Sequence, residues 1–192
     1  MAALSSGHMN TYVVLLRGVN VGGKNSVSMA SLRAALEGLG YENVASYINS
    51  GNVLVDSRKS ATKVRTDVEK VLADSFGLDR ESARAAVLTR AQLEAVVAKK
   101  PKGFGDQPAK FHSDAVFLID FDSKEAMRVF SPREGVDTVW AGDGVIYSQR
   151  LSAMRTKSRL NRIVGTPAYK SMTIRSWNTT LKLLAILTDR SS

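Results

Sequence analysis

The sequence predicts an α+β protein made of two tandem ferredoxin-like units, each a βαββαβ plait with an antiparallel sheet and a trailing helix. Short apolar runs alternate with segments of helical periodicity in the order β-α-β-β-α-β-α, and this order repeats after residue 112. The closing segments of the two halves, residues 87–93 and 172–178, both read as strand, arginine and amphipathic helix. We expect a first domain over residues 10–100, a linker over 101–112 and a second domain over 113–192.

In the first half, serines and glycines mark where helices begin and end. Ser28 is the expected N-cap of a first helix that Gly40 closes, and Gly77 closes a second helix over residues 60–76. A trailing helix is expected over residues 90–99. The expected strands are short runs rich in apolar residues, over residues 12–17, 44–48, 52–56 and 83–88.

The second half begins after a segment rich in proline and glycine, residues 101–112, which is typical of a linker. Gly142-Asp-Gly144 predicts a hairpin between two strands. Helices are expected over residues 123–130, 154–164 and 177–187. Strands are expected over residues 115–119, 136–141, 145–149 and 171–174.

The composition favours a globular protein in a reducing compartment. The 192 residues contain no cysteine, which excludes disulfides and thiolate chemistry. No apolar run reaches the ~20 residues that a membrane span needs, so we expect a cytoplasmic protein without membrane association. Residues 1–9 lack the basic start and long apolar run of a signal peptide and are predicted to be a disordered tail or a remnant of cloning.

The loop after the first strand is the most site-like part of the chain, because apolar residues give way abruptly to glycine, asparagine and lysine. Glycine lets the backbone adopt positive φ and approach a ligand closely. In a plait the first and third strands are antiparallel neighbours, so this loop is expected beside the turn over residues 49–52. The predicted ligand-binding residues are Arg17, Asn20, Gly22, Gly23, Lys24, Asn25, Asn49, Ser50 and Asn52.

Other interpretations of this loop stay open. The asparagines alone can tie the loop backbone together, as Asx turns do. Residues 18–25 nearly match the phosphate-binding pattern G-x-x-x-x-G-K-[ST], but Asn25 stands where a Mg²⁺-binding Ser or Thr is needed. We therefore expect no cofactor, and a looser anion site built from Arg17, Lys24 and loop amides.

The net charge of +9 is concentrated toward the end of the chain. Residues 144–187 contain no Asp or Glu and eight Lys or Arg residues, which leaves +1 for the rest. On the expected helix over residues 154–164, three arginines share one face, which would suit the phosphates of RNA or DNA. A merely solvated basic face is the alternative. The predicted polyanion-binding residues are Arg155, Lys157, Arg159, Arg162, Lys170 and Arg175.

Familiar catalytic sets cannot be assembled from this chain. His112 is the one histidine outside the N-terminal tail, and it is expected at the surface or in packing. Asp120 and Asp122 are the remaining metal-ligand candidates, and we expect them to cap the helix that starts at Ser123. Trp140 and Tyr147 are expected in the core, not on a base-stacking surface. We expect no metal and assign no catalytic residue.

Three segments resemble the signatures of a bacterial family, domain-of-unknown-function family 1697. They are Leu16-Arg-Gly-Val-Asn-Val-Gly-Gly-Lys-Asn25, Tyr47-Ile-Asn-Ser-Gly-Asn-Val53 and Arg175-Ser-Trp-Asn-Thr-Thr-Leu-Lys182. The resemblance extends from about Met9 to the last helix. In the third segment, Ser176 stands where the family usually has asparagine. The resemblance implies a pair of α/β-plait domains and no established activity.

The leading functional hypothesis is a protein that binds an anionic ligand or a nucleic acid, through the Gly/Asn/Lys loop and the basic C-terminal half. The first alternative is an enzyme that acts on a phosphorylated or carboxylated metabolite at the Arg17–Lys24 loop. The second is a protein-interaction module whose exposed sheet edges pair with a partner or with another copy, which leaves a homodimer open.

Overall fold

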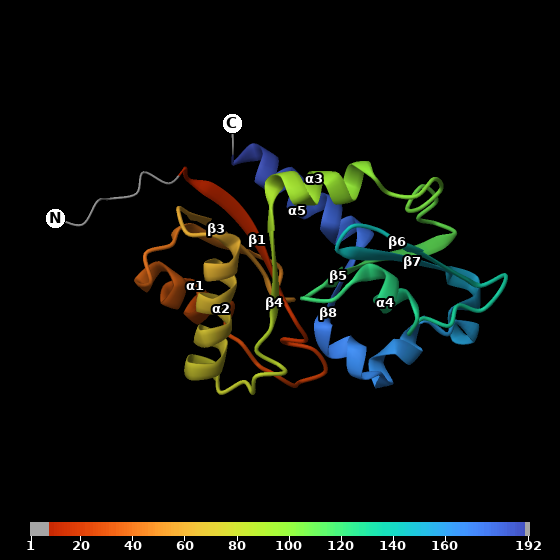
Figure 1. The fold of residues 1–192 in the computed structure, drawn as a ribbon, viewed down its shortest axis with the longest axis horizontal. Coiled ribbons are helices and arrows are strands. Elements are labelled where there is room, and N and C mark those ends of the chain that lie inside the picture. Colours follow the sequence, from red (N-terminus) through yellow and green to blue (C-terminus); the bar gives the residue numbers. More distant parts are fainter. Residues whose placement is uncertain (1–7, 191–192) are drawn as a thin grey trace. The chain divides into compact units, whose positions relative to one another are not determined.

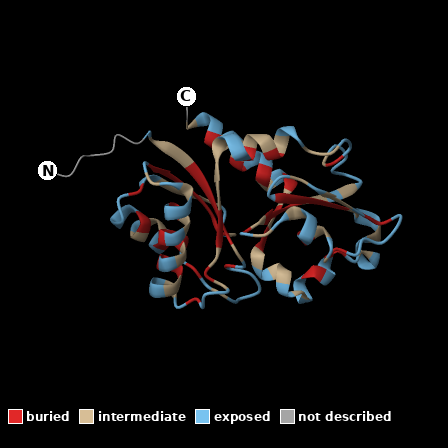
Figure 2. Ribbon diagram, in the orientation of Figure 1, coloured by how far each residue is buried: buried red, intermediate tan, exposed pale blue. Residues whose placement is uncertain are grey.

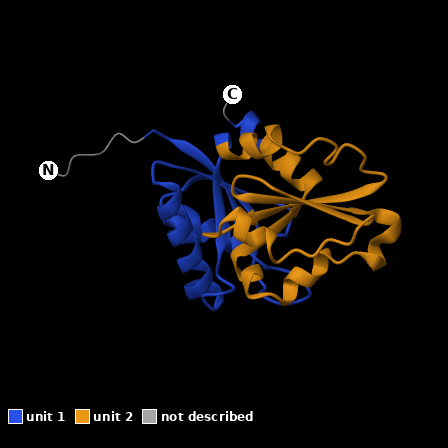
Figure 3. Cartoon of the chain, turned by 45° about the vertical axis from the view of Figure 1, so that its right-hand side comes forward, with its two compact units in different colours: residues 1–91, 186–192 blue, residues 92–185 orange. Residues whose placement is uncertain are grey.

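The computed structural model describes residues 8–190, so most of the predicted N-terminal tail lies outside the described residues (Figure 1). The chain divides into two compact units, residues 1–91 with 186–192 and residues 92–185 (Figure 3). Each unit holds one four-stranded antiparallel sheet, which confirms the mixed α and β class. None of the helices in the described part of the chain has the length and apolar character needed to cross a membrane.

Unit 1 has the strand order β2-β3-β1-β4. Its sheet and helices are β1 (Asn10–Leu16), α1 (Met29–Gly38), β2 (Glu42–Tyr47), β3 (Asn52–Ser57), α2 (Ala61–Phe76) and β4 (Ala85–Thr89). The two central strands, β1 and β3, are buried along nearly their whole length (Figure 2). Figure 1 shows α1 and α2 side by side on one face of this sheet, where Leu32, Leu36 and Val68 join the core.

The helix ends of unit 1 confirm the caps predicted at Ser28 and Gly77, and they add a cap at Ser60, which was expected as the first helical residue. Ser28 Oγ accepts a hydrogen bond from Ser31 N at the start of α1. Ser60 does the same for Lys63 N at the start of α2, and Gly77 ends that helix with φ +67°. These side chains satisfy amides that the first helical turn leaves without partners.

Unit 2 has the strand order β6-β7-β5-β8. Its elements are most of α3 (Arg90–Ala98), β5 (Phe111–Leu118), α4 (Ser123–Met127), β6 (Asp137–Ala141), β7 (Val145–Leu151), the 3₁₀ turns η1 (Ser152–Lys157), η2 (Leu160–Gly165) and η3 (Pro167–Ser171), β8 (Met172–Ser176) and most of α5 (Trp177–Asp189). One sheet face packs against α4 and the 3₁₀ turns, through Ile146, Ala126 and Leu160. On the other face, Tyr147 Oη donates to the carbonyl of Val96 in α3.

The prediction of a single helix over residues 154–164 is wrong. The segment forms separate 3₁₀ turns, with extended backbone at Ser158 and non-helical angles at Met154. Its two buried residues, Leu160 and Ile163, are three positions apart, which is the repeat of a 3₁₀ helix. Proline at 167 then favours the extended conformation of Thr166. The arginines therefore do not share one α-helical face.

Residues 92–112 group with unit 2, so the division between units falls before the predicted linker. Phe104 is fully buried and packs edge-on against Trp177 and Tyr147, with ring centroids 4.9 and 5.1 Å away. A segment with the composition of a linker is thus part of a packed core, because one aromatic residue among its turns buries a large apolar surface.

Candidate anion-binding sites

The structure brings the loop after β1 beside the turn before β3, as the predicted strand pairing requires. Leu15 lies opposite Asn52 in the sheet, and Leu16 N donates to the carbonyl of Gly51 over 2.8 Å. Asn20 Nδ2 then donates to the carbonyl of Asn49 over 3.0 Å. Two segments that carry the first two family-like motifs therefore form one end of one sheet.

Gly51 is a point of close approach between these segments. Its φ is +76°, and a Cβ atom there would lie 2.5 Å from Val19 Cγ2 and 2.8 Å from Leu16 Cβ. Only glycine meets both the conformation and the space. The packing of the two segments thus requires a residue without a side chain at position 51.

Most of the polar side chains that were predicted to bind a ligand here form hydrogen bonds within this loop and the turn beside it. Asn20 has φ +56°, donates to the carbonyl of Val27 over 2.9 Å and accepts from Val27 N over 2.8 Å. Asn25 Nδ2 donates to the carbonyl of Gly18. Asn52 is buried and donates to Ser50 Oγ over 3.0 Å. These contacts favour the backbone-tying interpretation for the asparagines.

The part of the loop that faces solvent is its tip. Lys24 N donates to the carbonyl of Val21 over 3.1 Å, and the two glycines between them both have positive φ, as a type I′ turn needs. Lys24, Gly22, Gly23 and Asn49 are exposed. Arg17 is half-buried, and its Nη1 donates to the carbonyl of Glu81 over 3.1 Å. An anion would therefore meet one lysine and the main chain of the turn.

Five of the six predicted polyanion-binding residues are exposed on the segment between β7 and β8. We call this segment, residues 152–170, the basic crossover; its exposed cations are Arg155, Lys157, Arg159, Arg162 and Lys170. The sixth residue, Arg175, is buried and donates to Thr173 Oγ1 and to the carbonyl of Ile174. Burial lowers the pKa of Arg175 to about 10, and this residue is no part of the exposed surface.

The Asp137 carboxylate anchors the basic crossover to the sheet. Its Oδ2 accepts from the main-chain N–H of Arg159 over 2.8 Å and from that of Arg133 over 3.0 Å. Burial alone would raise the pKa of Asp137, but these hydrogen bonds outweigh burial and lower it. A charged carboxylate at physiological pH thus fixes the backbone from which the arginines project.

The aromatic residues of unit 2 form a buried cluster. Tyr147 is buried, and Trp140 is half-buried with its ring centroid 6.0 Å from that of Phe104. Both were expected in the core. Among the described residues no aromatic side chain falls in the exposed class, so the surface of unit 2 offers no aromatic platform for stacked bases.

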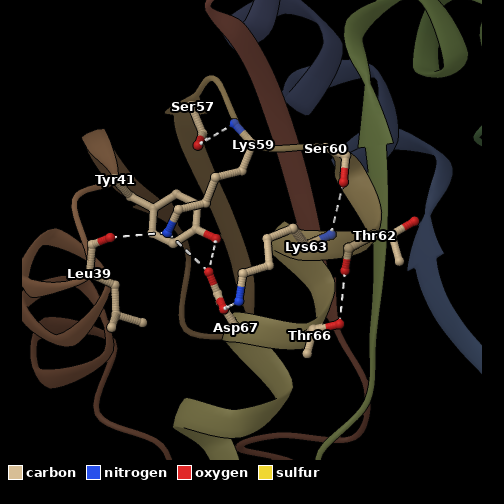
Figure 4. A network of polar contacts seen from close by, with 9 residues as sticks. All are labelled: Leu39, Tyr41, Ser57, Lys59, Ser60, Thr62, Lys63, Thr66 and Asp67. Carbon is tan, nitrogen blue, oxygen red and sulfur yellow. Dashed lines mark hydrogen bonds and ion pairs between the residues drawn. The ribbon is translucent and has the colours of Figure 1, made fainter. Parts of the chain in front are cut away.

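A polar network in unit 1 was not predicted. The buried Asp67 carboxylate accepts from Lys63 Nζ over 2.6 Å, from Lys59 Nζ over 3.0 Å and from Tyr41 Oη over 2.8 Å (Figure 4). Lys59 Nζ also lies 4.3 Å from the centre of the Tyr41 ring and donates to the carbonyl of Leu39. The spacing of Lys63 and Asp67 by four residues on a helix is a sequence signal, but nothing local connects them with Tyr41 or Lys59.

Burial alone would raise the pKa of Asp67, but hydrogen bonds from the two lysines and the tyrosine outweigh it and lower the pKa to about 2. Burial, together with the Asp67 carboxylate, raises the pKa of Tyr41. Every group in the network is paired within unit 1, so we interpret it as a clamp between the α1–β2 loop, the β3–α2 loop and α2.

The carboxylates do not form a metal centre in the part of the chain that the structure describes. Asp122 instead caps α4, since its Oδ1 accepts from Lys124 N over 2.8 Å and from Glu125 N over 3.2 Å. This confirms the helix-capping interpretation of Asp122.

The fold defines a class of mixed α/β proteins with two four-stranded antiparallel sheets. The chain belongs to the family described as "Protein of unknown function (DUF1697)", whose model matches residues 9–147, and this confirms the resemblance seen in its motifs. A solved structure, described as that of conserved bacterial protein SP0830 from Streptococcus pneumoniae, is similar to it. The two share 29% identity with a TM-score of 0.81, over 94% of this chain and 99% of the other. A search of curated proteins found no match.

Proposed function

We propose that the protein binds nucleic acid as a polyanion, through the basic crossover of unit 2. The observation that supports this is the gathering of five exposed cations on one short segment, within a stretch that lacks Asp and Glu. Cations that neutralise phosphates release condensed counterions, and this release drives binding without regard to sequence.

The way the crossover is held supports the same proposal. Leu160 and Ile163 are buried in the core of unit 2, and Asp137 pins the main chain at Arg159. The cations therefore project from a backbone whose position is fixed, so less ordering entropy is lost when phosphates bind. Without exposed aromatic residues, contacts to phosphates would outweigh contacts to bases.

Fluorescence anisotropy with a labelled DNA duplex, titrated at several salt concentrations, tests this proposal. If four or five cations contact phosphates, log K should fall against log salt with a slope of about −3.5 to −4.5. The double variant Arg155→Glu and Arg159→Glu should weaken binding by more than about tenfold and reduce the slope by about two.

The matched control reverses two exposed arginines of unit 1, Arg58→Glu and Arg80→Glu. This variant has the same net charge as the crossover variant. Equal loss of binding in both variants, or binding that does not respond to salt, would contradict a site on the crossover.

A second candidate function is binding of a small phosphorylated or carboxylated compound at the tip of the loop after β1. It is favoured by the exposed Lys24 beside the main-chain N–H groups of Gly22 and Gly23. Inorganic phosphate and citrate should then raise the melting temperature, and Lys24→Ala should abolish that rise without lowering the melting temperature of the free protein. A rise that persists in Lys24→Ala would contradict this site.

We further propose that each unit is a ferredoxin-like plait. The strand orders β2-β3-β1-β4 and β6-β7-β5-β8, with β1 and β5 between two antiparallel neighbours, support this topology. An experimental structure with β1 or β5 at a sheet edge would contradict it.

A further inference from the structure

The third family-like segment lines a hollow of about 110 Å³ in unit 2. Ser176, Trp177 and Asn178 contribute from the end of β8 and the start of α5. The remaining lining residues come from β5 and the loop before it, and they are Gly105, Pro108, Phe111, His112 and Ser113. Neither the basic crossover nor the loop after β1 uses these residues. We propose that this hollow binds a small monocarboxylate, with its carboxylate at His112 and a short apolar tail against Trp177 and Phe111.

The His112 ring is held by a carboxylate two residues further along the same strand. Its Nε2 lies 3.1 Å from Asp114 Oδ1, and Asp114 Oδ2 lies 3.8 Å from Arg150 Nη1. Burial raises the pKa of Asp114, against the opposing charges of His112 and Arg150. A hydrogen bond at Nε2 fixes the ring orientation, and in our proposal the ligand meets the other ring nitrogen, Nδ1. The His112 side chain is 45% exposed, so a solute can reach it.

The walls of the hollow are fixed by a single buried amide. Gln149 Oε1 accepts from Gly105 N over 3.0 Å and from Ser113 Oγ over 2.8 Å, and so joins the loop to β5. Gly105 has φ +73°, and a Cβ atom there would lie 2.4 Å from Trp177 Cδ1. The loop therefore presses directly on the indole. Because the walls are formed before a ligand arrives, little ordering is lost on binding.

The size and chemistry of the lining determine the class of ligand. A volume of 110 Å³ is several times the roughly 10–15 Å³ that one water molecule needs, which admits an acid with a short chain. The described lining contains no lysine or arginine, so an anion with a single negative charge suits it better than a phosphate group, which carries more charge. Pro108, Phe111 and Trp177 offer apolar contact to a tail. Asn178, which is exposed, supplies a second donor for the carboxylate.

The probe for this proposal is sodium propionate, added to isotopically labelled protein. Nuclear magnetic resonance reports on the His112 ring and the Trp177 indole N–H. We expect saturable shifts of both signals with propionate and none with propionamide, which has the same shape without the charge. His112→Gln should weaken the propionate affinity at least about tenfold, since it removes a charge-assisted hydrogen bond.

Lys124→Gln is the matched control, because it removes an exposed positive charge from α4, outside the hollow. It should leave the propionate affinity unchanged. Asn178→Ala keeps every charge and should weaken the affinity a few fold. The proposal is overturned if the shifts grow linearly without saturation, if propionamide reproduces them, or if His112→Gln and Lys124→Gln reduce the affinity equally.

Discussion

Asn20 Nδ2 donates a hydrogen bond of 3.0 Å to the main-chain carbonyl of Asn49, and this contact joins two loops that lie 29 positions apart in the sequence. The same side chain exchanges hydrogen bonds with the main chain of Val27. One asparagine thus organises the end of the sheet in unit 1, and its own conformation, at φ +56°, is one that asparagine tolerates better than most residues.

Replacing this side chain should therefore loosen both loops. We expect Asn20→Ala to lower the free energy of unfolding by about 2 kcal/mol, from three partly exposed hydrogen bonds and backbone strain. Hydrogen exchange at the Val27 amide should accelerate. Asn49→Ala is the control, because the bond uses the carbonyl of Asn49 and its side chain is exposed. Similar acceleration in both variants would contradict this role of Asn20.

A comparison of Gly51 with Gly77 separates two costs of adding a side chain: the strain of a positive φ, and the lack of space for a Cβ atom. Both have positive φ, but a Cβ atom at Gly77 would have no neighbour within 4 Å. We expect Gly77→Ala to cost about 1 kcal/mol and Gly51→Ala about 2–4 kcal/mol, since the second also forces Val19 and Leu16 apart. Urea denaturation of both variants measures the difference. Equal costs would show that Val19 and Leu16 move aside freely.

The Asp67 network should make unit 1 sensitive to acid. The pKa of Asp67 is lowered from 3.8 to about 2 in the folded protein, so its ionised form stabilises the fold above pH 3.8. That contribution is lost as the pH falls from about 4 toward 2. With its lysine partners partly exposed, we expect at most about 2 kcal/mol.

Comparison with Asp67→Asn measures this contribution. The variant should be less stable than the original protein at pH 7 and nearly equal to it at about pH 2, by urea denaturation. Asp74→Asn is the control, because Asp74 lies on the same helix but is exposed beside Lys70. A stability difference for Asp67→Asn that is the same at both pH values would argue against the ion pairs as its source.

Phe104 should determine whether residues 101–112 behave as a linker or as core. We expect Phe104→Ala to destabilise the protein by about 3–5 kcal/mol, because it empties the centre of an aromatic cluster. Trypsin should then cut first at Lys102 or Lys110. Phe121→Ala, which alters a half-buried residue outside this segment, should not redirect the first cut there. Rapid cleavage of the unaltered protein within 101–112 would contradict a packed segment.

The sequence was most informative where local rules suffice. The caps at Ser28, Gly77 and Asp122 depend on nearby residues, and the meeting of residues 17–25 with 49–52 follows from antiparallel pairing. It was least informative about side chains that choose among distant partners. From the sequence alone, the side-chain amide of Asn20 could have bound a ligand. In the structure it donates hydrogen bonds to the main-chain carbonyls of Val27 and Asn49 instead.

Two other differences between the sequence prediction and the structure also arise from contacts between residues distant in the sequence. Leu160 and Ile163 fit both an α-helix and a 3₁₀ turn, and only the packing in unit 2 selects between these. Likewise, the glycines and prolines of residues 101–112 are equally suited to a free linker and to tight turns around a buried aromatic ring. The composition of this segment does not indicate whether Phe104 packs against Trp177 and Tyr147.

The turns between β7 and β8 leave room for evolutionary change. Short 3₁₀ turns need no continuous ladder of hydrogen bonds, and Leu160 with Ile163 attaches them to the core. A cation can therefore be gained or lost between these attachment points without disturbing the sheet beneath. Descendants of this chain can therefore vary the charge of this segment while folding alike.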